Sequence, residues 1–279
     1  MTLPRFRLLA LDLDGTLLNS AREISATNRR TIEKTRAAGI EVAIVTERRF
    51  LSGRPYIELL GDDLFAVTNS GAITRQCPDG PILRRRLLPI QVATFVLGVA
   101  KNFNMEPLVH DGPEAQGYIF LSERTRSIPQ IHRYLNEASP PSWVTEVLLK
   151  RDPVQVGFTG TVDGIRKLET ELRRKLEAGH QQVNLARTEY PDEDFALLDV
   201  LAEDATKSSA LAFLSGKLGL AIEETMAIGD NWNDLDMLEL AGLGVLMRNA
   251  SEELRCRGFT ETGTNDKSGV AEAIERYLL

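Results

Sequence analysis

Cysteine and histidine are scarce in this 279-residue sequence, which contains two cysteines and three histidines. Cys77 and Cys256 lack the spacing of a metal site, so we expect reduced thiols and a cytoplasmic protein. The histidines fall outside every motif described below. This argues against histidine catalysis and against a metal bound by histidine.

Long apolar runs and an excess of positive charge are lacking as well. No stretch approaches the roughly 20 residues needed to cross a membrane, and the first residues do not form a cleavable signal pattern. The 33 basic residues are outnumbered by 40 acidic ones, whereas nucleic acids and anionic membranes select basic surfaces. We therefore expect no nucleic-acid or membrane partner, and a monomer or homodimer.

The sequence does contain a series of short apolar stretches rich in β-branched residues. Helical patterns separate them, such as residues 26–38, with Ser25 as the N-cap and Gly39 as the stop. This alternation is typical of a parallel sheet covered on both faces, so the sequence predicts an α/β, Rossmann-like core. Ligands bind at the carboxyl ends of such strands. The predicted strands are Arg7–Leu11, Ile40–Thr46, Leu64–Asn69, Thr225–Asp230 and Gly242–Met247.

The middle of the chain has a different pattern, in which short strands come in pairs. PLVHD precedes YIFLS, WVTEVLL precedes VQVGFTG, and QVNLA precedes FALLDV, with helical stretches between the pairs. This mixture predicts an inserted α+β domain with a largely antiparallel sheet. We place it at residues 84–202, between the two parts of the core at residues 1–83 and 203–279.

The first apolar strand ends in two carboxylates, Asp12 and Asp14, followed by Gly15. Residues two apart on a strand share a face, so the two acids can converge, and a hard cation such as Mg²⁺ would relieve their repulsion. One carboxylate can attack phosphorus, and the other can donate and accept the proton. The alternative is a strand end followed by a turn, with both acids in solvent.

Other polar residues follow the ends of further predicted strands or begin a helix. Asp230, Asn233 and Asp234 can meet the first acids at one metal, or they can be solvated loop residues. Lys207 begins a helical pattern, where the helix dipole disfavours a cation unless an anion such as phosphate lies nearby; otherwise it extends to solvent. Thr46 ends the second strand and either holds a phosphoryl oxygen or is an ordinary strand-end threonine.

Taken in order, these motifs resemble those of the haloacid dehalogenase-like phosphatase superfamily. The position and strand pairs of the insert are similar to the large type II cap, and the closest group resembles the Cof-type sugar-phosphate phosphatases. The resemblance covers almost the whole chain. Its main motifs are D-L-D-G-T at Asp12–Thr16, Thr46, Lys207 and G-D-N-W-N-D at Gly229–Asp234; lesser landmarks are TNSGA at Thr68–Ala72, MRNA at Met247–Ala250 and SGVAEAI at Ser268–Ile274.

The resemblance implies catalytic and metal-binding roles at the two acidic motifs. Asp12 would be the nucleophile and Asp14 the general acid and base. Mg²⁺ would be held by Asp12, the carbonyl group of Asp14 and Asp230, with Asp234 in support.

The remaining family positions imply substrate binding. Thr46 and Lys207 would bind the transferring phosphoryl group, and Asn233 would contact phosphate or orient Lys207. Arg48 and Asn69 would reach the substrate; their alternatives are a surface arginine and a turn-forming asparagine.

Three departures from the family pattern put in doubt any substrate carried over from relatives. The usual T-G-R is Thr46-Glu47-Arg48 here, N-G-A is N-S-G-A, and M-G-N-A is M-R-N-A. Glu47 either turns away to pair with Arg48 or Arg49, or it faces the leaving group and selects substrate. Trp232 is expected to pack under its loop.

The sequence therefore predicts a Mg²⁺-dependent phosphatase that hydrolyses a small phosphorylated metabolite, expected to be a sugar phosphate, through an aspartyl phosphate. A phosphotransferase or phosphomutase of the same family would use the same core. A non-catalytic phosphometabolite-binding protein is a third possibility, against which the intact Asp12, Asp14, Lys207 and Asp230 argue.

Overall fold

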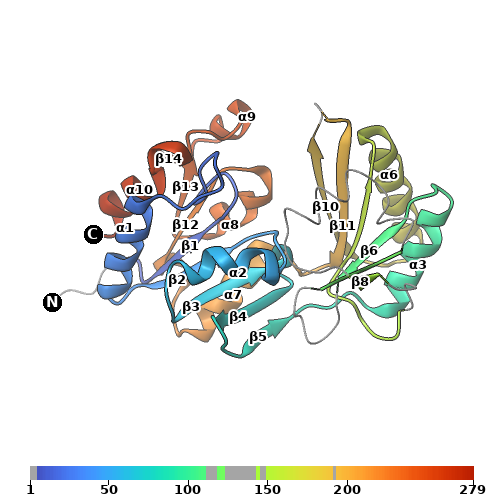
Figure 1. Cartoon of the computed structure of the whole chain (residues 1–279), viewed down its shortest axis with the longest axis horizontal. Coiled ribbons are helices and arrows are strands. Elements are labelled where there is room, and N and C mark those ends of the chain that lie inside the picture. Colours follow the sequence, from blue (N-terminus) through green and yellow to red (C-terminus); the bar gives the residue numbers. More distant parts are fainter. Residues whose placement is uncertain (1–4, 111–117, 123–142, 145–148, 191–192) are drawn as a thin grey trace. The chain divides into compact units, whose positions relative to one another are not determined.

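The computed structural model of the chain describes residues 5–110, 118–122, 143–144, 149–190 and 193–279 (Figure 1). The chain divides into two compact units. One comprises Met1–Arg48, Gly53–Arg84 and Thr206–Leu279, and the other comprises Arg49–Ser52 and Arg85–Ala205. Within the described residues, no helix is both long and apolar enough to cross a membrane.

The first unit is built on an eight-stranded sheet with the order β14-β13-β12-β1-β2-β3-β4-β5. Neighbours from β14 to β3 are parallel, and β4 is antiparallel to β3. All five predicted strands lie in this sheet, so the predicted α/β class is confirmed. The strands are β1 (Leu8–Leu11), β2 (Glu41–Val45), β3 (Leu64–Thr68), β4 (Ile73–Cys77), β5 (Ile82–Arg85), β12 (Thr225–Gly229), β13 (Leu243–Met247) and β14 (Thr260–Thr262).

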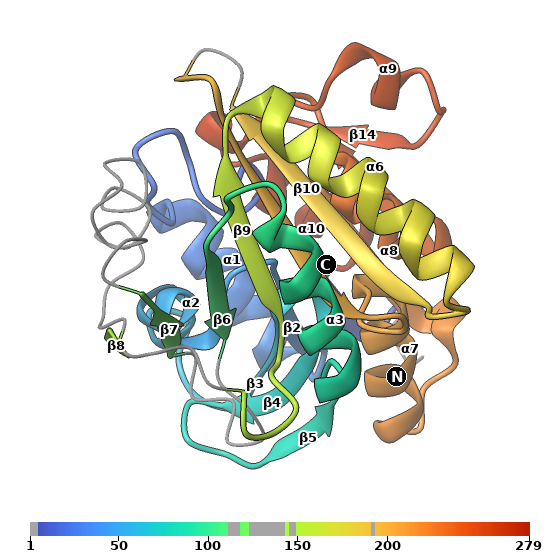
Figure 2. The same ribbon diagram turned by 90° about the vertical axis from the view of Figure 1, so that its right-hand side faces the viewer.

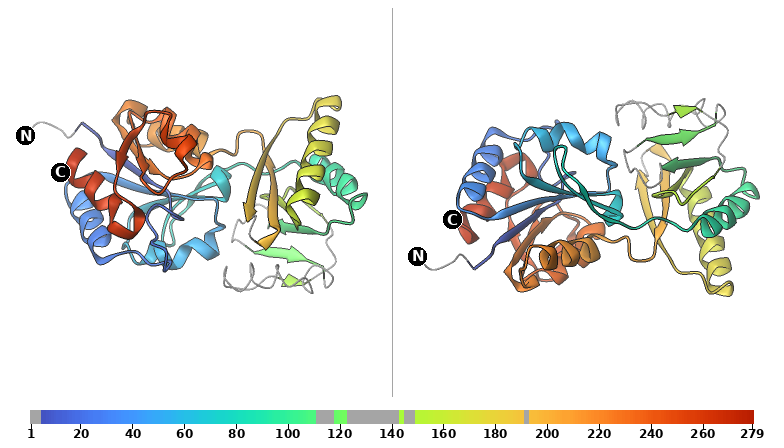
Figure 3. Two further views of the ribbon diagram at one scale, coloured as in Figure 1. Left: turned by 90° about the horizontal axis from the view of Figure 1, so that it is seen from above. Right: turned by 90° about the horizontal axis from the view of Figure 1, so that it is seen from below.

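Helices cover both faces of this sheet (Figure 3). One face carries α1 (Ala26–Ala37), α2 (Phe50–Glu58) and α10 (Gly269–Tyr277), and the other carries α7 (Lys207–Lys217) and α8 (Leu235–Leu240). A short helix, α9 (Glu252–Arg255), precedes β14. As predicted, Ser25 caps α1: its hydroxyl accepts the N–H of Asn28 at 3.1 Å.

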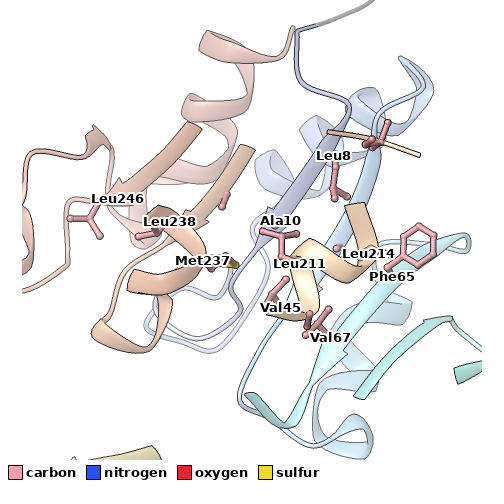
Figure 4. Packing of buried hydrophobic residues seen from close by; sticks show 14 of the residues in the cluster. Leu8, Ala10, Val45, Phe65, Val67, Leu211, Leu214, Met237, Leu238 and Leu246 are labelled. Atoms are coloured by element: carbon pink, nitrogen blue, oxygen red, sulfur yellow. The ribbon is translucent and has the colours of Figure 1, made fainter. Parts of the chain in front are cut away.

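Burial on both faces explains why the strands are apolar throughout. Leu8 and Ala10 of β1 pack with Leu211 and Leu214 of α7 (Figure 4). The alternate residues Leu9 and Leu11 are also fully buried. Each fully buried leucine contributes about 1.5–3 kcal/mol relative to an exposed one. The buried sheet therefore fixes the positions of the residues that directly follow its strands.

The second unit contains a six-stranded sheet with the order β10-β11-β9-β6-β7-β8 (Figure 2). Helices α3 (Ile90–Lys101) and α6 (Val162–Ala178) pack on one face. Neighbouring strands in this order are antiparallel, except β7 and β8, which are parallel. The strands are β6 (Pro107–His110), β7 (Ile119–Leu121), β8 (Trp143–Val144), β9 (Val156–Gly160), β10 (Val183–Tyr190) and β11 (Phe195–Ala202).

Two of the three predicted strand pairs in this unit are confirmed: β6 with β7, and β10 with β11. The pairing of WVTEVLL with VQVGFTG is wrong within the described residues, because β8 pairs with β7 and β9 lies between β11 and β6. Residues 145–148 of that stretch lie outside the described part. The physical reason is burial. β9 is buried along nearly its whole length, as in a central strand, and it pairs with β11 along one edge and with β6 along the other, so neither edge is left for β8.

Candidate active site

The register of the first sheet brings three strand ends together. Leu11 of β1 lies opposite Ile44 of β2 and Ile228 of β12, and the N–H of Asp12 donates to the carbonyl of Ile228 at 3.0 Å. The polar residues that follow these strands therefore meet at one edge, as parallel pairing requires.

The buried side chain of Lys207 forms ion pairs with two of these residues, Asp12 and Asp234. Its Nζ donates to Asp12 Oδ1 at 2.6 Å and to Asp234 Oδ1, and all three side chains are buried, with residue exposures of 2 %, 4 % and 0 %. Burial lowers the pKa of Lys207, but the charges of Asp12, Asp234 and Glu47 outweigh it and the net pKa is raised. The lysine is therefore a fixed ammonium in the site.

Lys207 is the first residue of α7, and Thr206 is the N-cap of this helix. The Thr206 hydroxyl accepts the N–H of Ser209 at 3.1 Å. The carboxylate of Asp236 also accepts the N–H and the hydroxyl of Ser208, at 3.2 and 2.6 Å. These partners satisfy exposed donors of the first helical turn and fix the backbone from which the lysine extends.

Asp12, Asp230 and Asp234 form a compact acidic group. One oxygen of each lies within 4.8 Å of the others. The Thr16 hydroxyl donates to Asp230 at 2.8 Å, while Asp234 accepts the N–H groups of Asp230 and Asn231 at 3.0 and 3.1 Å. A Cβ on Gly15, where φ is +79°, would lie 2.3 Å from Asp230 Oδ2, so only glycine allows this close approach.

The pKa values in this acidic group reflect an excess of negative charge. Burial and the neighbouring Asp234 raise the pKa of Asp12, and the same two causes raise that of Asp230 to about 7. Three carboxylates face the single ammonium of Lys207. A divalent cation would neutralise the excess, and carboxylate oxygens are ligands that Mg²⁺ prefers. The donor set fits the expected metal.

Asp14 lies outside this acidic group. Both of its carboxylate oxygens accept hydrogen bonds from Arg48, from Nε at 2.6 Å and from Nη2 at 2.5 Å, and its side chain is 53 % exposed. The guanidinium of Arg48 also lies over the ring of Tyr56, 5.0 Å from its centroid. Arg48 therefore holds the predicted acid and base in this structure, and its predicted contact with substrate stays a prediction.

The structure places the other predicted residues at the same strand ends. The Thr46 hydroxyl is buried and accepts the N–H of Arg48 at 3.1 Å. Asn69 is buried directly after β3. The Oδ1 atom of Asn233 is buried and has no hydrogen-bond partner among the described residues, so it is available to a ligand.

The expectation that Trp232 packs under its loop is wrong, because the residue is 47 % exposed. The guanidinium of Arg257 lies 5.7 Å from the centroid of its ring. The helical turn Trp232–Asp234 directs Asp234 fully inward, and this geometry leaves the tryptophan outside.

Sequence reasoning missed a group that supports the loop after β1. Asn249 donates from Nδ2 to the carbonyl of Gly15 at 2.8 Å, and its Oδ1 accepts the N–H of Asn265 at 3.0 Å. Asn265 in turn donates to the carbonyl of Leu18 at 2.9 Å. The available signal was the MRNA landmark, which contains Asn249 but does not say what its side chain contacts.

Gly71 holds the end of β3 against the start of α7, where Lys207 lies. Its φ is +103°, and an added Cβ would meet the carbonyl oxygen of Thr206 at 2.0 Å. We expect Gly71→Ala to lower the free energy of unfolding by about 2–4 kcal/mol, from strain and overpacking together. The matched control is Gly39→Ala, where φ is +80° but nothing lies within 4 Å, so only about 1–2 kcal/mol should be lost. Equal losses in urea denaturation would show that the contact carries no cost.

Comparison with known proteins identifies the family of the chain. Residues 9–274 match the family described as haloacid dehalogenase-like hydrolase. The chain is 28 % identical to phosphatase YwpJ of Bacillus subtilis, over 98 % of this chain and 100 % of the relative. It is 28 % identical to the 5-amino-6-(5-phospho-D-ribitylamino)uracil phosphatase YcsE of the same organism, over 98 % and 96 %. A crystal structure of a haloacid dehalogenase-like hydrolase from Bacteroides thetaiotaomicron superposes with a TM-score of 0.83 and 28 % identity, covering 97 % of this chain and 99 % of the other.

The chain belongs to the haloacid dehalogenase-like hydrolase family. Within it, the protein is a phosphatase, a phosphoric monoester hydrolase of the Cof-type group with a cap. The predicted resemblance and the predicted enzyme class are confirmed. The roles of the individual site residues stay predictions.

Proposed function

We propose that the protein is a Mg²⁺-dependent phosphatase that hydrolyses a small phosphorylated metabolite, a sugar phosphate, through an aspartyl phosphate formed on Asp12. The observation that carries this proposal is the buried carboxylate of Asp12, held by Lys207 at 2.6 Å within the acidic group at the strand ends. Lys207 opposes the effect of burial by favouring the ionised, nucleophilic form of this carboxylate, and its hydrogen bond fixes the orientation of Asp12 toward an entering phosphoryl group.

Asp12 performs the first displacement. One of its oxygens forms a bond to phosphorus while the bond from phosphorus to the ester oxygen breaks, and Asp14 gives a proton to the departing alkoxide. Water then attacks the phosphorus, Asp14 takes its proton, and Asp12 is released as a carboxylate. The single residue Asp14 is thus acid in one step and base in the next.

Charge compensation is the second requirement, because a phosphate dianion must approach several carboxylates. Lys207 supplies one positive charge, and Thr46 and Asn233 supply polar groups at the same edge. Mg²⁺, held by Asp12, Asp230, Asp234 and the carbonyl of Asp14, would supply the electrostatic stabilisation that these groups alone do not provide.

The pairing of Asp14 with Arg48 has a consequence for this proposal. A proton donor must contact the leaving oxygen, yet both carboxylate oxygens of Asp14 accept from Arg48 here. Asp14 therefore has to exchange this partner for the substrate during turnover. Its 53 % exposed side chain leaves room for a rotamer change.

A relative supports the substrate class. The name of YcsE states a phosphate on a ribityl chain, a small sugar-alcohol ester. This agrees with a phosphatase of small metabolites and leaves the individual ester to be found by assay.

We expect the protein to release p-nitrophenol from p-nitrophenyl phosphate with Mg²⁺, and to stop when excess EDTA removes the metal. The reason is the uncompensated charge of Asp12, Asp230 and Asp234. Activity should return when Mg²⁺ is added beyond the EDTA. Undiminished turnover by metal-free protein would refute the metal requirement.

Phosphate transfer to added sugar, in place of release to water, would identify a phosphotransferase.

A further inference from the structure

Glu47 is a carboxylate at the site that the reaction scheme does not use. It directly follows Thr46 at the end of β2, on the strand next to the one that ends in Asp12. Its residue is half-buried. Its charge acts on Lys207, where it is one of three carboxylates that raise the pKa of the lysine. Its position after Thr46 therefore puts the charge of Glu47 close enough to act on Lys207.

This carboxylate lacks the partner that an ordinary loop acid would have. It makes no hydrogen bond or ion pair with any residue of the described part of the chain. Of its two expected partners, Arg48 is occupied by Asp14 and Tyr56, and Arg49 is buried. A half-buried carboxylate without a partner in the protein is open to a cationic group of a bound ligand.

Glu47 also changes the charge that a substrate meets. Together with Asp12, Asp230 and Asp234 it makes four carboxylates around one ammonium. A divalent cation would still leave a negative balance, against which a phosphate dianion must bind. A substrate that carries its own positive charge near the phosphate removes this conflict, and a carboxylate without a partner is the group that would bind it.

We propose that Glu47 is a specificity-determining residue that selects phosphate esters whose leaving group carries a protonated amine. The proposal rests on the proposed phosphatase function and names the chemistry of its substrate: an aminosugar phosphate or another zwitterionic ester is favoured over the hydroxyl-bearing ester of the same shape.

Matched pairs of substrates test this selection. The pairs are glucosamine 6-phosphate with glucose 6-phosphate, and phosphoethanolamine with ethylene glycol monophosphate; within each pair a hydroxyl replaces the amine. We expect the wild-type protein to show a kcat/KM at least about tenfold higher for the amine of a pair, equivalent to about 1.4 kcal/mol. Glu47→Gln, which keeps the shape and removes the charge, should bring the ratio close to one.

A matched control separates selection from a general loss of negative charge. Glu41 begins the same strand and is also half-buried, so Glu41→Gln removes a charge at the end opposite to the site. This variant should keep the wild-type ratio. Where Glu47→Gln fails to fold by circular dichroism, Glu47→Gly replaces it, because the family pattern carries glycine at this position.

The outcomes distinguish the two proposals. Turnover of p-nitrophenyl phosphate by the wild type, without a preference for amines, overturns the role of Glu47 and leaves the phosphatase. A preference that persists in Glu47→Gln or Glu47→Gly also overturns it. Absence of turnover with every ester in the presence of Mg²⁺ overturns the proposed function, and the selector role with it.

Discussion

Asp12→Asn is expected to abolish turnover of every phosphate ester, by at least about 10⁴-fold in kcat, without unfolding the protein. The amide has the size of the carboxylate but cannot form the acyl phosphate. Stability should be retained or increased, because burial and Asp234 already disfavour the ionised form of Asp12 in the folded state, as its raised pKa shows. Lys207 keeps its bond to Asp234.

The measurement is kcat for p-nitrophenyl phosphate together with the melting temperature. Asp266→Asn is a suitable control, since Asp266 lies outside the acidic group and accepts two hydrogen bonds from Ser20. The control should retain wild-type kcat. Turnover by Asp12→Asn within tenfold of the wild type would refute Asp12 as the nucleophile.

Lys207→Met is expected to lose both activity and stability. The methionine fills the space of the lysine but leaves Asp12, Asp230 and Asp234 without their buried counter-charge. Removing one partner of a buried ion pair costs about 3–5 kcal/mol. The bound phosphoryl group also loses its fixed cation, so little turnover should remain.

The stability loss should depend on pH with a definite sign. Without the lysine the three carboxylates repel more strongly. The pKa values of Asp12 and Asp230, which burial and Asp234 already raise, then rise further above the values in the unfolded chain, so the folded state binds more protons. Stability should therefore fall as pH rises from about 5 to about 8. Urea denaturation of metal-free protein at both pH values measures this difference, and Mg²⁺ should reduce it.

Lys217→Met provides the control for this prediction. Lys217 ends the same helix and is exposed, so its replacement should change stability by less than about 0.5 kcal/mol. A Lys207→Met variant as stable as Lys217→Met at pH 8 would contradict the charge balance described for the site.

The sequence alone predicted the first sheet well because its strands are buried on both faces. Leu8–Leu11 has no polar position, and such runs are difficult to place anywhere except in the interior of a parallel sheet. Parallel strands end at one edge, so the predicted convergence of Asp12, Asp230 and Asp234 needed only the strand order. The structure brings these acids together with Lys207.

Features that depend on side-chain direction or long-range contact could not be predicted. The bond from Arg48 to Asp14 requires knowing which way an exposed carboxylate turns. The approach of Gly71 to Thr206 joins backbones far apart in sequence, and neither residue signals it. Trp232 was misplaced because a loop pattern does not reveal which residue of a helical turn faces inward.

The pairing error in the second sheet has a related cause. Strands that follow each other along the chain commonly pair, and WVTEVLL followed by VQVGFTG fitted that rule. The local pattern did not reveal that β9 already has neighbours on both edges, from β6 and β11. Sheet order is set by packing of the whole unit against α3 and α6, which no short stretch encodes.

The central claim, covalent catalysis by Asp12, can be tested directly by trapping the phosphorylated residue. Asp14→Asn is the suitable protein, because p-nitrophenolate leaves without a proton whereas the attack of water needs a base, so only the second step is slowed, by about 10²–10⁴-fold. The protein is mixed with p-nitrophenyl phosphate and Mg²⁺, quenched in acid, reduced with borohydride, which converts a phosphorylated aspartate to homoserine, and sequenced by mass spectrometry. The account predicts homoserine at position 12 and no conversion in Asp12→Asn; homoserine at another position, or rapid turnover without any trapped residue, would contradict it.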